Sequence, residues 1–138
     1  MTTFEQILMG SLLLGLCSLI HVSALVIAVT WLTNMFGKFA GITHWGILVG
    51  TAFAIVVLSH TVQISVWATS FVALGAFAEG AEAIYFAITT YTTVGYGDIT
   101  LGNQFRLFAA MAAVTGLLNF GLSTAFLVGL LSRMWQRN

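Results

Sequence analysis

Residues 92–98 read TTVGYGD, and they interrupt a chain that is otherwise strongly apolar. Glycine readily adopts positive φ values that other residues avoid, so Gly95 and Gly97 predict irregular backbone rather than a helix or a strand. A short, mostly apolar segment, residues 81–92, comes directly before the stretch. What such a backbone does depends on the solvent around it, which the composition identifies.

The composition is that of an integral membrane protein. Of the 138 residues, 59% are hydrophobic and only 6% are charged, and the mean hydropathy is +1.03. A soluble domain carries about 25% charged residues, and so few charges could not cover a surface exposed to water. The sequence has no nucleophile–base pairing, no metal-ligand spacing and no phosphate-binding loop, which argues against an enzyme. No nucleic-acid partner is expected.

Three charge-free stretches mark the membrane spans. No Asp, Glu, Lys or Arg occurs in residues 6–37, 39–78 and 107–132, and a spanning helix needs about 20 mostly apolar residues. We therefore predict an all-α membrane protein with one domain, residues 1–138. Its three transmembrane helices are expected at residues 7–36, 45–77 and 105–134.

The segment before TTVGYGD is too short to be a further span. Twelve helical residues, 81–92, rise about 18 Å, whereas the hydrocarbon core is about 30 Å thick. A chain that enters the membrane over this distance must return, and irregular backbone is tolerated there only inside protein or beside a water-filled cavity. We predict a re-entrant helix at 81–92 and a loop at 93–98 whose carbonyls face an aqueous axis.

The basic residues predict the orientation. Lys38, Arg133 and Arg137 all fall on one side if there are three spans and one re-entrant loop. Basic residues favour the cytoplasmic side, so we expect the N-terminus outside and the C-terminus in the cytoplasm. The loop then enters from outside.

The residues of the loop resemble a known family. Thr93-Val94-Gly95-Tyr96-Gly97 resembles the selectivity filter of potassium channels. Residues 82–91 are similar to the pore helix of that family, and residues 116–125 to the inner helix of small bacterial channels. The second span resembles the outer helix of a group of small bacterial ion channels, in a pattern formed by His60, Ile64, Trp67 and Ala68.

The resemblance implies a homotetramer, because one chain holds one filter strand and a closed ring needs four. It also implies K⁺ sites formed by the carbonyls of Thr93, Val94, Gly95 and Tyr96, with the Thr93 hydroxyl at the innermost site. Four positions correspond to residues that support the filter: Asp98, Thr89, Tyr85 and Phe86. Thr89 stands where some relatives carry glutamate, and Tyr85 and Phe86 stand where some carry paired tryptophans.

The last span carries the residues expected to line the cavity and gate. At 100° per residue, one sector contains Leu117, Phe120, Thr124 and Val128. The resemblance places these positions along the ion pathway, while periodicity alone is equally consistent with a packing face. Gly116 resembles the hinge glycine of the family, and close approach to another helix is the alternative.

Two histidines and the first span are not explained by a minimal pore. His21 and His60 lie within apolar spans, where ionisable residues are expensive. They are candidates for pH sensing or for neutral hydrogen bonds between helices. The first span is either a structural collar or the docking surface of a separate regulatory protein.

We predict a potassium-selective channel that conducts K⁺ passively. No arginine-rich span or attached ligand-binding domain is expected, so neither voltage nor a bound ligand is the predicted trigger. No cofactor is expected beyond permeant K⁺, and the predicted surroundings are the lipid of the plasma membrane, as in a bacterial inner membrane. A weakly selective cation channel and a regulatory, non-conducting membrane subunit are the alternatives.

Overall fold

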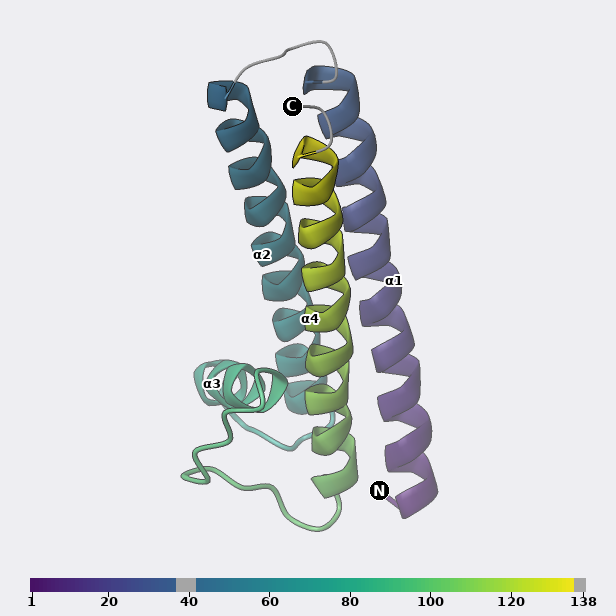
Figure 1. Cartoon of the computed structure of the whole chain (residues 1–138). Helices are drawn as coiled ribbons and strands as arrows, with labels where there is room; N and C mark the ends of the chain where they lie inside the picture. The colour runs from purple at the N-terminus through teal and green to yellow at the C-terminus, as the bar shows by residue number, and fades with distance from the viewer. Residues whose placement is uncertain (37–41, 136–138) are drawn as a thin grey trace.

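The computed structural model describes residues 1–36 and 42–135, which form four helices and no strand. They are α1 (Thr3–Phe36), α2 (Ile42–Ala73), α3 (Gly80–Tyr91) and α4 (Arg106–Trp135). The long helices α1, α2 and α4 run side by side, and the short helix α3 lies beside the lower part of α2 and α4 (Figure 1). Lys38 and Arg137, which entered the predicted orientation, lie outside the described residues.

The three long helices match the predicted all-α class. Each contains a stretch long and apolar enough to cross a membrane, Thr3–Leu32, Trp45–Ala73 and Arg106–Arg133. Helices α1 and α4 begin at the same end of the bundle, and α2 runs in the opposite direction (Figure 1). The chain after α3 returns to the end of the bundle where α4 begins (Figure 1).

The second span ends earlier than expected, at Ala73 rather than at residue 77. The reason is a helix-terminating motif in which Gly75 adopts a positive φ of 75°. The Gly75 N–H donates to the carbonyl of Val72, and the Ala76 N–H donates to that of Phe71. This pair of bonds satisfies the last carbonyls of the helix and turns the chain toward α3.

Helix α1 begins with a reciprocal cap. The Glu5 carboxylate accepts a hydrogen bond from the backbone N–H of Thr2 at 2.7 Å, and the Thr2 hydroxyl accepts one from the N–H of Glu5 at 3.3 Å. These two bonds satisfy donors that have no partner within the helix. The capping box explains why the helix starts at Thr3, before the predicted start at residue 7.

Helix α4 is capped by a residue of another helix. Its preceding residue, Phe105, has no side-chain acceptor, so the first N–H groups of α4 need an external partner. The side-chain oxygen of Gln6, from α1, accepts from the N–H of Leu107 at 3.0 Å and of Phe108 at 3.4 Å. Gln6 therefore fastens the start of α1 to the start of α4, although 101 residues separate it from Leu107.

Replacing Gln6 with leucine is expected to destabilise the protein by about 1–3 kcal/mol, because buried N–H groups of α4 lose their acceptor. The measurement is the thermal unfolding midpoint of the purified protein in detergent. Gln104→Leu is the matched control, since Gln104 is exposed just before the same helix. Equal midpoints for the two variants would contradict the capping role of Gln6.

Two apolar clusters form the core, with polar side chains between them. The lower cluster joins all four helices and centres on the aromatic side chains of Trp67, Phe71 and Phe108, which are fully buried. The upper cluster joins α1 and α2 through Ala28, Leu32, Leu48 and Ala52. Between these levels lie buried polar side chains of every helix, here called the polar layer: His21, Ser59, His60, Gln63, Tyr91, Asn119 and Ser123.

Candidate functional site

The segment after α3 is tied to the last turn of that helix. The N–H of Thr93 donates to the carbonyl of Thr90, and the N–H of Gly95 donates to the carbonyl of Thr89, both at 3.0 Å. The first residues of the loop therefore cannot move independently of the end of α3. Any side chain that holds this end in place also holds the loop.

Positive φ values alternate along the loop. Thr93, Gly95 and Gly97 have φ angles of 61°, 50° and 79°, whereas Val94 and Tyr96 are not among the residues with positive φ. Glycine takes this conformation without steric penalty. A backbone that alternates in hand turns successive carbonyls toward the same side, which is the arrangement that can replace the hydration shell of an ion.

Thr93 is the unexpected member of this set. Positive φ in a β-branched residue is a genuine outlier, and such strain, about 1–3 kcal/mol, persists only where the surroundings impose it, commonly at functional sites. The sequence predicted irregular backbone with positive φ at Gly95 and Gly97 but offered no signal for Thr93. The N–H of this strained residue is bonded to Thr90 at the end of α3.

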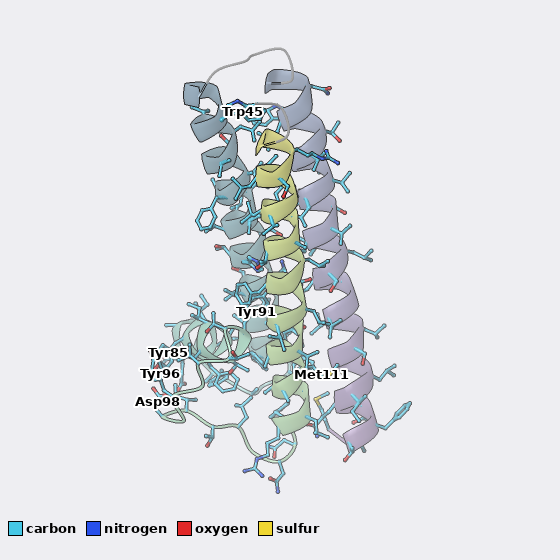
Figure 2. The ribbon with its side chains drawn as sticks, viewed as in Figure 1. Trp45, Tyr85, Tyr91, Tyr96, Asp98 and Met111 are labelled. Atoms are coloured by element: carbon cyan, nitrogen blue, oxygen red, sulfur yellow. The ribbon has the colours of Figure 1, made fainter. Side chains whose placement is uncertain are left out.

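The side chains of the loop project away from the bundle. Val94 is 53% exposed and Tyr96 is 72% exposed in the single chain, and Figure 2 shows Tyr96 beside Asp98 and Tyr85 at the outer edge of α3. Apolar and aromatic groups exposed next to strained backbone are normally covered by something else.

Asp98 is held by Tyr85 of α3. The Tyr85 hydroxyl donates to Oδ2 of Asp98 at 2.6 Å, and the N–H of Ile99 donates to Oδ1 at 3.1 Å. The hydrogen bond from Tyr85 holds the pKa of Asp98 below its ordinary value and raises the pKa of Tyr85 itself. The end of the loop is thus tied to α3, as its beginning is.

The other two predicted supporting residues have different neighbours. Phe86 is buried in the lower apolar cluster, with its ring centroid 5.3 Å from Phe71 and 5.2 Å from Phe77. It holds α3 against α2. Thr89 is also buried, and its hydroxyl donates to the carbonyl of Phe86 within the same helix. Only the backbone carbonyl of Thr89 reaches the loop, through Gly95.

Replacing Tyr85 with phenylalanine is expected to make Asp98 protonate at a higher pH. The folded-state pKa of Asp98 is lowered, so the stabilisation by its ionised form is present at neutral pH and is lost as the pH falls through that pKa. Without the Tyr85 hydroxyl the pKa of Asp98 returns toward its ordinary value, so the variant is less stable at neutral pH and loses less stability on acidification. The measurement is the unfolding midpoint of the purified protein as a function of acidic pH.

Glu82→Gln is the control for this experiment, because Glu82 is an exposed carboxylate in the first turn of the same helix. It should leave the acid transition of Asp98 in place. An acid transition in Tyr85→Phe that coincides with that of the wild type would show that Tyr85 does not set the protonation of Asp98.

The residues predicted to line the cavity share one exposed face of α4. Leu117 is 65% exposed, Phe120 38% and Val128 56%, and Thr124 is also exposed, with its hydroxyl bonded to the carbonyl of Phe120. The face is largely exposed in one chain, although the ring of Phe120 also packs against those of His60 and Tyr91. Its assignment to an ion pathway stays a prediction.

Gly116 lies where α4 meets the end of α3. A Cβ atom on Gly116 would stand 1.9 Å from the carbonyl oxygen of Tyr91 and 2.9 Å from its carbonyl carbon. Only glycine allows the backbones to approach so closely. The contact agrees with the close-approach alternative for Gly116, and its role as a hinge stays a prediction.

The two histidines meet within the polar layer. Their ring centroids are 4.8 Å apart, and Nε2 of each lies within 3.0 Å of the hydroxyl oxygen of Ser123. Nδ1 of His60 lies 2.9 Å from the hydroxyl of Tyr91, and Nδ1 of His21 lies 3.1 Å from Nε2 of Gln63. Both rings therefore bond to uncharged partners on other helices.

Some members of the polar layer were not predicted as site residues. The Tyr91 hydroxyl also lies 2.8 Å from the side-chain oxygen of Gln63, and the side-chain amide of Asn119 donates to the same oxygen. The available sequence signal was the helical spacing of polar residues in apolar spans, at positions 59, 60 and 63 and at 119 and 123. Spacing shows that each set shares a face, but it does not show that the faces meet.

Comparison with known proteins gave one match. A family model described as "Ion channel" matches residues 59–133, which is more than half of the chain and includes α3, the loop and nearly all of α4. No curated protein and no solved structure matched the chain.

Proposed function

Since the chain belongs to the ion-channel family, we propose that it forms a potassium-selective pore in which residues 93–97 are the selectivity filter. Membership in this family and three apolar helices together indicate a membrane-embedded protein that transports ions. The family is not a class of enzymes. The finer points, which are potassium selectivity, assembly and orientation, are the proposal.

The alternating φ angles of Thr93, Gly95 and Gly97 are the observation that carries the proposal. Carbonyls on one side of a strand can replace the water molecules that surround a cation in solution. The spacing and number of their oxygen atoms decide which ion is preferred. Backbone carbonyls of Thr93 to Tyr96 would provide the K⁺ sites. The C-terminal end of α3, where helix carbonyls are partly negative, would further stabilise a cation in the cavity.

The exposed loop favours a homotetramer. A single strand surrounds no ion, and the side chains of Val94 and Tyr96 are exposed in the isolated chain. Four copies around one axis would place the carbonyls toward the ion and cover these side chains with a neighbour. The exposed face of Leu117, Phe120 and Val128 would then line the cavity and gate below the filter.

The test is the reversal potential of the purified protein in a planar bilayer, with K⁺ on one side and Na⁺ on the other. A reversal near the potassium limit, from protein that gel filtration identifies as a tetramer, is the expected result. A reversal near zero would indicate the weakly selective cation channel. The absence of any current from a verified tetramer would favour the non-conducting subunit. A monomer or dimer in gel filtration would contradict the proposed assembly.

A further inference from the structure

The hydrogen-bond roles within the polar layer follow from Ser123. Its hydroxyl donates to the carbonyl of Asn119 at 2.9 Å, and a hydroxyl has only one proton. The Nε2 atoms of His21 and His60, at 3.0 and 2.9 Å from the same oxygen, must therefore both donate to it. Each neutral ring carries its proton on Nε2, and each Nδ1 is an acceptor.

The single hydroxyl proton of Tyr91 lies between two acceptors, the side-chain oxygen of Gln63 at 2.8 Å and Nδ1 of His60 at 2.9 Å. A continuous chain of hydrogen bonds thus runs from His21 of α1, through Ser123 and His60, to Tyr91. Buried networks of this kind specify one geometry, because a member left without a partner is costly at low dielectric.

Tyr91 is the last residue of α3, two residues before the proposed filter. Its side chain is fully buried, and Figure 2 shows it directed into the bundle, away from Tyr96 and Asp98 at the outer edge. The backbone of Tyr91 rests on Gly116, while its hydroxyl is held by the polar layer. The end of α3 is therefore fixed both at its backbone and at the tip of this side chain.

The polar layer also reaches the proposed cavity. The ring of Phe120 packs against His60, with centroids 4.5 Å apart, and lies 5.7 Å from the ring of Tyr91. The same side chain is 38% exposed. One residue of the proposed ion pathway therefore rests directly on the chain that joins α1 to α3.

We propose that Tyr91 is a positioning residue for the filter, and that α1 holds Tyr91 in place through the polar layer. This inference rests on the proposed potassium pore. The proposal assigns a role to the first span that a minimal pore does not need. The collar formed by α1 then acts on ion selectivity and does more than add packing.

The first test removes only the hydroxyl of Tyr91. Tyr91→Phe keeps the ring and its packing, so the tetramer is expected to assemble. The permeability ratio of K⁺ over Na⁺ should fall by about three- to tenfold, the order of change that one lost buried hydrogen bond makes in an equilibrium constant. Thr61→Val is the control, because its hydroxyl bonds only to Val57 of the same helix and faces outward.

The second test asks whether α1 acts through Tyr91. In a double-mutant cycle of His21→Leu with Tyr91→Phe, the effects on the logarithm of the permeability ratio should be non-additive, although the two side chains share no bond. Gln6→Leu with Tyr91→Phe is the control cycle, and it should be additive, since Gln6 joins α1 to α4 elsewhere. His21→Gln, which keeps a donor near the position of Nε2, should restore most of the selectivity.

If His21→Leu does not assemble, Ser123→Ala takes its place, because it removes the oxygen shared by both histidines. Unchanged selectivity of Tyr91→Phe in a potassium-selective wild-type background would overturn the positioning role alone. Additive effects in the His21 cycle would overturn the action of α1. A wild-type reversal potential near zero would overturn the proposed function itself, so the two failures are distinguished in one set of recordings.

Discussion

Replacing Gly95 with alanine is expected to abolish the selectivity for K⁺ over Na⁺ while the oligomer remains assembled. Gly95 has a φ of 50°, in the left-handed region, where a Cβ atom costs about 1–2 kcal/mol. Apart from Gly95 itself and its two chain neighbours, no heavy atom of the chain lies within 4 Å of the place where that Cβ would stand. The effect therefore arises from backbone conformation: the strand relieves the strain by rotating a carbonyl away from the ion.

The measurement is the reversal potential in opposed K⁺ and Na⁺ solutions, together with gel filtration to establish assembly. Gly75→Ala is a closely matched control, because Gly75 also has a positive φ, 75°, and free space around it, but lies in the turn after α2. It should lose similar stability and keep its selectivity. A potassium-selective current from Gly95→Ala would contradict the assignment of residues 93–97 as the filter.

Gly116→Ala is expected to have the largest effect on folding and assembly. Its Cβ would meet the carbonyl oxygen of Tyr91 at 1.9 Å, and this backbone atom cannot turn aside as a flexible side chain can. Overpacking of this kind costs about 1–3 kcal/mol and occasionally more. It outweighs the gain of about 1 kcal/mol that alanine brings over glycine within a helix.

The measurement is the yield of tetramer after purification and the unfolding midpoint of the protein that remains. Gly129→Ala is the control, since Gly129 lies in the same helix with no atom within 4 Å of the added Cβ, and it should be neutral or stabilising. A fully assembled, stable Gly116→Ala protein whose currents differ only in opening and closing would instead favour the hinge over the close contact.

Much of the fold could be predicted from local features of the chain. The spans at 7–36, 45–77 and 105–134 follow from composition, because lipid requires apolar helices of a certain length. The ends of the helices were predicted less accurately than their positions. The helix-terminating motif at Gly75 ends α2 at Ala73, and the cap by Glu5 starts α1 at Thr3. Ends depend on a few hydrogen bonds, which periodicity does not report.

The candidate site, like the fold, could be predicted only in part. The positive φ of Gly95 and Gly97 was predictable, because glycine is the residue that reaches this region without penalty. The same conformation in Thr93 was not, because a β-branched residue ordinarily avoids it. Its bond to the end of α3 is visible only in the folded chain. The family resemblance implied only that Tyr85 and Asp98 support the filter, whereas the hydrogen bond between them is found only in the structure.

The amino-acid sequence alone therefore decided that the chain requires apolar surroundings, the number of helices that could span a membrane, and the glycine-containing loop. Each of these depends on neighbouring residues and on the physics of lipid. Tertiary structure alone decided which polar groups pair. His21 and Ser123 are separated by 102 residues, and they bond because α1 and α4 pack side by side. A buried donor must find its acceptor in space, and distance along the chain does not reveal where that acceptor lies.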